Sequence, residues 1–133
     1  MRTRTATCAC GQLQAEADGE PIRISVCHCL ACQRRTGSAF GVQARFPRDR
    51  VRISGDAREF VRHADDDGEP RTYSFCPACG STVYYVLDSQ PDLVAIAVGA
   101  FADPGFPPPR FSMYDPVRRH PWVTLPDDLE RRG

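Results

Sequence analysis

Seven cysteines dominate the chemistry that this sequence can support. They fall into three groups: Cys8-Ala9-Cys10-Gly11, Cys27-His28-Cys29-Leu30-Ala31-Cys32 and Cys76-Pro77-Ala78-Cys79-Gly80. Thiolates are strong ligands for zinc, and two cysteines separated by two residues let one tight turn aim both sulfurs at one ion. Seven is an odd number, so disulfides cannot pair every cysteine within one chain. The cysteines therefore predict metal binding rather than a disulfide framework.

The spacing suggests how the cysteines divide between two sites. A tetrahedral structural zinc needs four ligands, and the third group supplies two of them. Either upstream group can supply the others, and spacing alone does not decide which. Cys8 and Cys10 are favoured because their motif also ends in glycine. Pairing them leaves a compact set of three, Cys27, Cys29 and Cys32. Three protein ligands with one open position is the pattern of catalytic zinc, so we expect two zinc ions per chain.

Other interpretations of the cysteines stay open. The third group has the spacing of a thioredoxin-like redox pair, although no βαβ pattern surrounds it. The middle three cysteines are alternatively unligated core residues, and a single iron–sulfur cluster is a further alternative. His28 would point away from the face that Cys27 and Cys29 share in an extended segment. Hydrogen bonding or packing is therefore expected of His28, rather than ligation.

The elements that must position these cysteines are mostly β-strands. Short alternating or apolar segments are separated by proline and glycine, as in all-β domains. The predicted strands are Gln12–Ala17, Arg23–Val26, Ala39–Phe46, Val51–Ser54, Glu59–Arg62, Arg71–Phe75, Thr82–Leu87 and Leu93–Val98. The two that flank the third cysteine group are expected to pair as a hairpin. The last is a continuous apolar run, which predicts a strand buried on both faces.

Helix signals are scarce. Leu30–Thr36, followed by Gly37, predicts one or two helical turns that end at a glycine C-cap. Phe101–Pro109 is too rich in proline and glycine for regular structure, and Asp127–Arg132 predicts only a frayed terminal turn. The acidic segment Asp65–Pro70 predicts a solvated turn between two strands. The predicted fold class is therefore mostly β, with short antiparallel strands pinned by zinc-binding turns.

Length and composition narrow the class of protein further. At 133 residues, 41% of them hydrophobic, the chain has the size of a single domain, spanning 1–133. Seventeen basic residues balance seventeen acidic ones, which argues against nucleic acid as a partner. Every basic residue is arginine, so each cationic contact is a guanidinium suited to carboxylates. No apolar run reaches the roughly 20 residues of a membrane span, and no signal-like apolar region precedes Cys8. We expect no membrane partner and a cytoplasmic location, where thiols stay reduced.

The ordered set of motifs resembles a known family, the glutathione-dependent formaldehyde-activating enzymes, whose domain also occurs in centromere protein V. The resemblance covers nearly the whole chain and all seven cysteines. Besides the cysteine groups, it rests on Gln33–Gly37, Val98–Pro104 and the late Pro121-Trp122. It implies an Mss4-like β fold and the same division of the cysteines. Structural zinc is then held by Cys8, Cys10, Cys76 and Cys79, and catalytic zinc by Cys27, Cys29 and Cys32.

The resemblance also implies an activity, the synthesis of S-hydroxymethylglutathione from glutathione and formaldehyde by a carbon–sulfur lyase acting in the synthetic direction. A related thiol and another small electrophile are possible substrates as well. One departure concerns the substrate: family members carry a histidine-containing segment shortly before the late tryptophan, whereas Arg110–Asp115 here has none. The alternative function is a non-catalytic zinc-stabilised binding module or a glutathione carrier.

Substrate contacts can also be suggested from the residues. Glutathione carries two carboxylates, and Arg34 and Arg35 directly follow the middle cysteine group, so they are the predicted substrate-binding residues, with Arg45 behind them. These arginines would otherwise form surface ion pairs of little energetic value. The aromatic candidates for the walls of the pocket are Phe40, Phe101 and Trp122.

Overall fold

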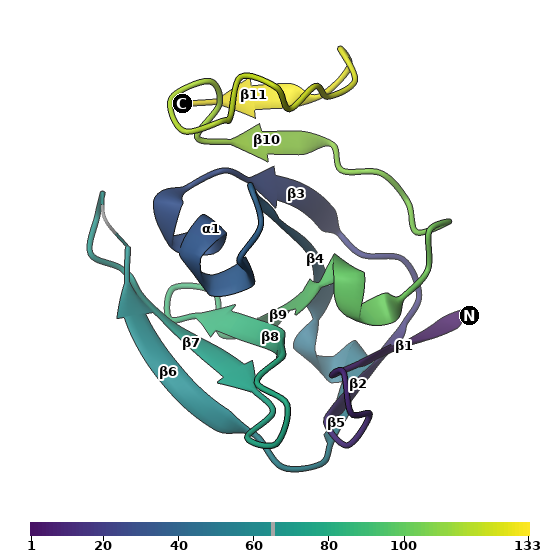
Figure 1. The fold of residues 1–133 in the computed structure, drawn as a ribbon. Coiled ribbons are helices and arrows are strands. Elements are labelled where there is room, and N and C mark those ends of the chain that lie inside the picture. Colours follow the sequence, from purple (N-terminus) through teal and green to yellow (C-terminus); the bar gives the residue numbers. More distant parts are fainter. Residues whose placement is uncertain (65) are drawn as a thin grey trace.

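Two β-sheets form the frame of the molecule (Figure 1). The computed structural model describes residues 1–64 and 66–133; Asp65, in the predicted Asp65–Pro70 turn, lies outside the described residues. The smaller sheet has the order β1 (Thr3–Thr7), β2 (Gln14–Asp18), β5 (Val51–Ser54). The larger has the order β11 (Glu130–Arg132), β10 (Phe111–Met113), β3 (Arg23–Cys27), β4 (Gly41–Pro47), β9 (Leu93–Ala97), β8 (Thr82–Leu87), β7 (Pro70–Phe75), β6 (Arg58–His63). Strand β10 pairs in parallel with both neighbours, and the other pairings are antiparallel.

Within residues 1–64 and 66–133, one short α-helix accompanies the sheets. Helix α1 (Leu30–Thr36) lies within the curve of the larger sheet and ends at Gly37, as predicted (Figure 1). Two 3-10 turns follow strands, η1 (Arg48–Arg50) after β4 and η2 (Val98–Phe101) after β9. In the described part of the chain, no helix is both long and apolar enough to cross a lipid bilayer.

The main core joins the two sheets. Ala15 and Ala17 of β2 pack with Phe46 of β4 and Ile96 of β9, and all four side chains are fully buried. The small alanine side chains let the two sheets approach closely. The opposite face of the larger sheet carries a separate cluster that contains Tyr73, Tyr85 and Ala95. The main core fills the face of the larger sheet that packs on the smaller sheet. The opposite face, with Tyr73 and Tyr85, is therefore the one available for a site beneath α1.

The predicted fold class is confirmed, since strands predominate over a single α-helix and 3-10 turns. All eight predicted strands are present with ends within two residues of the predicted ones, and β7 and β8 form the expected hairpin. Val94, Ala95 and Ile96 are buried in succession, so β9 is covered on both faces as predicted. The terminal turn predicted at Asp127–Arg132 is wrong in its second half, because Glu130–Arg132 forms strand β11 against β10.

Candidate functional site

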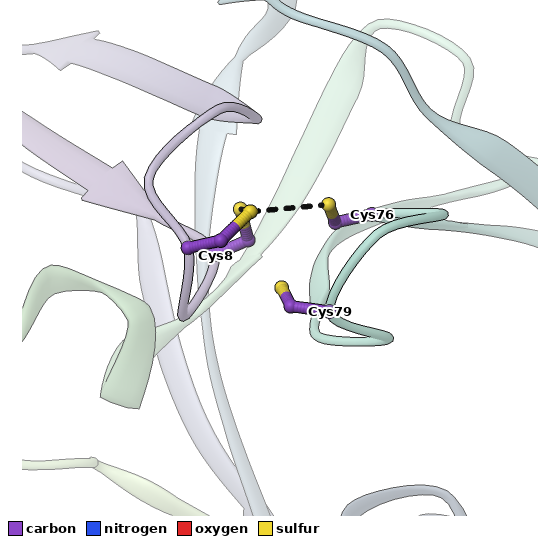
Figure 2. A group of neighbouring side chains, drawn as sticks. Cys8, Cys76 and Cys79 are labelled. Carbon is purple, nitrogen blue, oxygen red and sulfur yellow. Dashed lines mark hydrogen bonds between the residues drawn. The ribbon is translucent and has the colours of Figure 1, made fainter.

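Four cysteines from two distant turns meet where the sheets are joined. Cys8 and Cys10 come from the turn between β1 and β2, and Cys76 and Cys79 from the turn between β7 and β8. Their sulfurs all lie within 4.8 Å of one another, and Figure 2 shows the labelled side chains converging from the two turns. The Cys10 Sγ lies 3.6 Å from the Cys8 Sγ and 3.7 Å from the Cys76 Sγ. This four-cysteine cluster therefore links the smaller sheet to the larger one.

Hydrogen bonds to the Cys76 sulfur and two glycines shape the cysteine turns. The Ala78 backbone N–H and the Gln12 Nε2 both donate to the Cys76 Sγ, at 3.4 and 2.9 Å. Gly11 and Gly80 end the two cysteine turns with φ angles of 86° and 81°, which glycine adopts without a steric penalty. Hydrogen bonds to the charged form favour a thiolate over a thiol. The thiolate form of Cys76 is thus favoured, and the two glycines fix the shape of both turns.

The second cluster is local in sequence. Cys27 is the last residue of β3, Cys29 is the N-cap of α1, and Cys32 lies in the first turn of that helix. Their sulfurs lie within 4.8 Å of one another. The Cys32 N–H donates to the Cys29 Sγ at 3.3 Å, so this sulfur accepts the hydrogen bond that an N-cap oxygen usually accepts. Cys27 and Cys32 are buried and Cys29 is half-buried, so the three-cysteine cluster is reached from the side of Cys29.

The three thiols share negative charge unequally. Hydrogen bonds with Cys27 and then Cys32 lower the pKa of the Cys29 thiol to about 2, with Arg62 adding a smaller attraction. The same hydrogen bond with Cys29 raises the pKa of Cys27. The Cys29 sulfur also accepts the hydrogen bond from the Cys32 N–H, so negative charge is favoured at this position. Metal binding releases the remaining thiol protons, so a cluster that already holds one thiolate is prepared for a cation.

Both clusters fit a metal ion with thiolate ligands. Zinc–sulfur bonds of about 2.3 Å in a tetrahedral site place sulfurs about 3.8 Å apart, and the four-cysteine cluster shows 3.6 and 3.7 Å. All seven cysteines are free thiols, so no disulfide competes for them. These distances are consistent with zinc without identifying it, because other soft ions accept the same ligands. Four sulfurs complete a tetrahedral shell, whereas three leave one position open.

Of the two arginines predicted to contact substrate, Arg35 lies at the three-cysteine cluster and Arg34 lies further out. The Arg35 Nη2 is 3.8 Å from the Cys32 Sγ. Its guanidinium stacks over the rings of Tyr73 and Tyr85, with 4.9 and 5.9 Å to the ring centroids. Arg34 is exposed, and among the described residues it has no such contact with a cysteine sulfur or a tyrosine ring. Arg35 therefore has a fixed position next to the Cys32 sulfur, while Arg34 lies on the exposed surface of α1.

An arginine–tyrosine face surrounds Arg35 on the larger sheet; we define it as Arg35, Arg45, Arg71, Tyr73 and Tyr85. The register places Arg45, Tyr85 and Tyr73 in one row across β4, β9, β8 and β7. The Nε atoms of Arg35, Arg45 and Arg71 are buried without a hydrogen-bond partner in the described part of the chain. Burial raises the pKa of both tyrosines, so they stay neutral hydroxyl donors. Buried donors without partners are costly, and here they suit an anion.

Two cavities meet at Arg35, with volumes of about 600 and 520 Å³. The first is lined among others by Arg34, Arg35, Phe60, Arg62 and Tyr73, and the second by Arg35, Phe40, Gln43, Cys79 and Tyr85. Ligand sites commonly fall within this range of volume. Phe40 thus lines a cavity as expected. Phe101 instead packs in the core, and Trp122 is 71% exposed.

Several residues of the site were not predicted from the sequence. Tyr73 and Tyr85 lie in segments that predict strands, but a strand pattern does not indicate which of its two faces meets a site. Gln43 is buried with its Oε1 unpartnered among the described residues, and it lines the second cavity. No local pattern indicates these three residues as site residues, because pairing between distant strands decides which face of the sheet each one occupies.

Comparisons with known proteins agree with this geometry. A family model described as glutathione-dependent formaldehyde-activating enzyme matches residues 3–116. The fold is similar to the crystal structure of a Rhodobacter sphaeroides protein from a structural genomics effort, with a TM-score of 0.55 and 20% sequence identity. The likeness covers 78% of this chain and 91% of that chain. A search of curated proteins gave no match.

Proposed function

The chain belongs to the glutathione-dependent formaldehyde-activating enzyme family, and from this premise we propose that it joins glutathione, or a related carboxylate-bearing thiol, to formaldehyde or a similar small electrophile. In this proposal both clusters hold zinc, a structural ion at the four-cysteine cluster and a catalytic ion at the three-cysteine cluster. The observation that carries the proposal is a set of three sulfurs, within 4.8 Å of one another, beside the guanidinium of Arg35. Three ligands leave room for the sulfur of a substrate.

The proposed reaction forms one carbon–sulfur bond. Zinc bound at the three-cysteine cluster would supply an open position that favours the thiolate form of an added thiol near neutral pH, against a free-thiol pKa of about 8.5. The substrate sulfur adds to the aldehyde carbon, the electron pair of the carbonyl moves to its oxygen, and that oxygen takes up a proton. No leaving group is needed, and the product is a hydroxymethyl thioether.

The protein's own residues hold the thiol in place. Arg35 presents a guanidinium beside the Cys32 sulfur, and the buried Nε atoms of Arg45 and Arg71 lie on the same face of the sheet. Guanidinium groups bind carboxylates with paired, charge-assisted hydrogen bonds. The ion pairs found among the described residues include none of these three arginines. A thiol with carboxylates would give these cations partners while its sulfur reaches the cluster.

The test is a calorimetric titration of zinc-loaded protein with reduced glutathione and with S-methylglutathione. We expect saturable binding of the free thiol and at least tenfold weaker binding of the methylated form, because methylation removes the thiolate. Equal binding of both would show recognition of the peptide without its sulfur, as in a glutathione carrier. No binding of either would contradict the proposal and leave a zinc-stabilised module with another ligand.

Arg35→Gln is expected to weaken glutathione binding by about 10- to 100-fold, because a hydrogen bond between charged groups contributes about 1.5–3 kcal/mol. Binding of 2-mercaptoethanol, which has no carboxylate, should change little. The measurement is competition between each thiol and a chromophoric thiol. Arg48→Gln, an exposed arginine in η1, is the matched control and should bind both thiols as the wild type does. Equal weakening of the two thiols would exclude a carboxylate as the partner of Arg35.

A further inference from the structure

A buried chain of polar side chains leads away from the three-cysteine cluster. His28, Ser112 and Asp115 are 0%, 0% and 3% exposed. The Ser112 Oγ donates to the Asp115 Oδ2 at 2.8 Å, and the same hydroxyl lies 3.0 Å from the His28 Nε2. Because the serine proton is directed at the carboxylate, the serine oxygen accepts from an Nε2–H. The chain of hydrogen bonds therefore fixes both the tautomer and the plane of the imidazole ring.

Asp115 is the fixed end of this chain. The Arg119 Nε donates to its Oδ1 at 2.8 Å, and the Arg131 Nη1 donates to its Oδ2 at 2.6 Å. Burial raises the pKa of Asp115, but hydrogen bonds from Arg119, Ser112 and Arg131 outweigh this effect and lower it overall. The group is thus a carboxylate held from two sides by guanidinium groups. Charge-assisted hydrogen bonds of this kind are about twice as strong as neutral ones.

His28 is anchored at its backbone as well as its ring. Its N–H donates to the carbonyl of Met113 at 3.1 Å, and its carbonyl accepts from the Gln33 Nε2 at 2.8 Å. The register of β3 and β10 places Met113 directly opposite Cys27. The peptide groups of His28 are those that join it to Cys27 and Cys29. Holding the ring and both peptide groups therefore holds the two ligand backbones.

We propose that Asp115, acting through Ser112 and His28, is the positioning residue of the three-cysteine cluster. The chain keeps the Cys27 and Cys29 sulfurs on one side of an extended segment, at the separation that one metal ion requires. Groups that orient metal ligands from outside the ligand shell contribute to metal affinity, and their loss typically lowers it about 10- to 100-fold. The inference rests on the proposed function, since it takes this cluster to hold zinc.

The two arginines that hold Asp115 lie beyond the part of the sequence that the family model matches. That match ends at residue 116, whereas Arg119 and Arg131 come later in the chain. Arg131 lies in β11, which pairs with β10. The segment after β10 and strand β11 therefore do more than extend the larger sheet. They supply Arg119 and Arg131, the cations that keep Asp115 charged and in place behind the cluster.

The test compares zinc affinity at the two clusters by competition with a chromophoric chelator. Ser112→Ala removes only the hydroxyl that links Asp115 to His28, and Asp115→Asn removes the charge. We expect each variant to lower the zinc affinity of the three-cysteine cluster at least tenfold, with the affinity of the four-cysteine cluster unchanged as an internal reference. Ser25→Ala is the matched control, because Ser25 is also a buried serine and accepts from the Arg23 Nε instead.

The outcomes separate this inference from the proposed function. Unchanged zinc affinity in both variants, whatever their thermal stability, would overturn the inference, and so would an equal loss at both clusters. Glutathione binding to the wild type is measured independently and is not needed for either result. A wild-type protein that holds only one zinc ion would contradict the proposed function, and the inference with it.

Discussion

Cys76→Ser is expected to abolish cooperative folding. Cys76 is fully buried, and its sulfur accepts hydrogen bonds from Gln12 and Ala78 in the cluster that links the two sheets. Structural zinc in small cysteine sites contributes an apparent binding free energy of about 10–16 kcal/mol at pH 7. The free energy of unfolding of a domain is only about 5–15 kcal/mol, so weakening this site removes most of it.

The measurement is thermal unfolding followed by circular dichroism, together with zinc content by mass spectrometry. We expect the variant to show no sharp transition and the wild type to lose its transition when a strong chelator is added. Cys32→Ser is the matched control, because it replaces another buried cysteine by the same residue at the other cluster. A Cys76→Ser protein that melts within a few degrees of the wild type would contradict a structural role for this cluster.

Cys32→Ser should remove one of two zinc ions and, with it, thiol binding. The fold should persist, because β3 and α1 are also held by strand pairing with β4 and β10 and by the helix backbone. A serine hydroxyl ionises only far above neutral pH and is a poor zinc ligand, so two thiolates would remain at this cluster. Glutathione binding should fall by more than a factor of 100, and product formation should fall to the rate of the uncatalysed reaction.

The measurement combines zinc content, the glutathione titration, and the rate of hydroxymethyl adduct formation followed by nuclear magnetic resonance. The loss of one zinc ion alone would show only that Cys32 is a ligand. Loss of zinc with full retention of glutathione binding would contradict the proposed site, since the thiol would then bind elsewhere. The Cys76→Ser variant serves as the comparison, because it is expected to unfold the protein, whereas Cys32→Ser is expected to remove only the ion of the three-cysteine cluster.

Local sequence patterns predicted the elements near the cysteines well. Leu30–Thr36 forms the predicted helix because Gly37 adopts a left-handed conformation at its end, a local property. The strands that were missed carry no apolar pattern of their own or depend on distant partners. Thr3–Thr7 buries Arg4 beside Ala6, so its inward positions do not look apolar in sequence. Strand β10 has only three residues and exists because β3 and β11 pair with it.

The candidate site likewise has a part that local motifs predict and a part that depends on contacts between distant residues. Motifs of a few residues show three groups of cysteines and favour, without deciding, how they combine, and the structure brings together the two favoured sets. The location of Arg35 over Tyr73 and Tyr85 follows from the packing of α1 on the larger sheet, which no local pattern contains. The role of His28 was foreseen as hydrogen bonding rather than ligation, but its partner Ser112 is 84 residues away.

The two clusters differ in the length of chain that each must close. Cys10 and Cys76 are 66 residues apart in sequence, whereas the cysteines of the other cluster lie within one short segment. Closing the longer loop costs on the order of 2 kcal/mol more in chain entropy, and it must wait until both ends have left the ribosome. During synthesis, Cys27, Cys29 and Cys32 can therefore come together before the four-cysteine cluster closes, and the residues that we propose to position them, Ser112 and Asp115, emerge later. Joining of the two sheets should then depend on the supply of metal to the four-cysteine cluster, so chains made without metal would keep the cysteine turns of the two sheets apart.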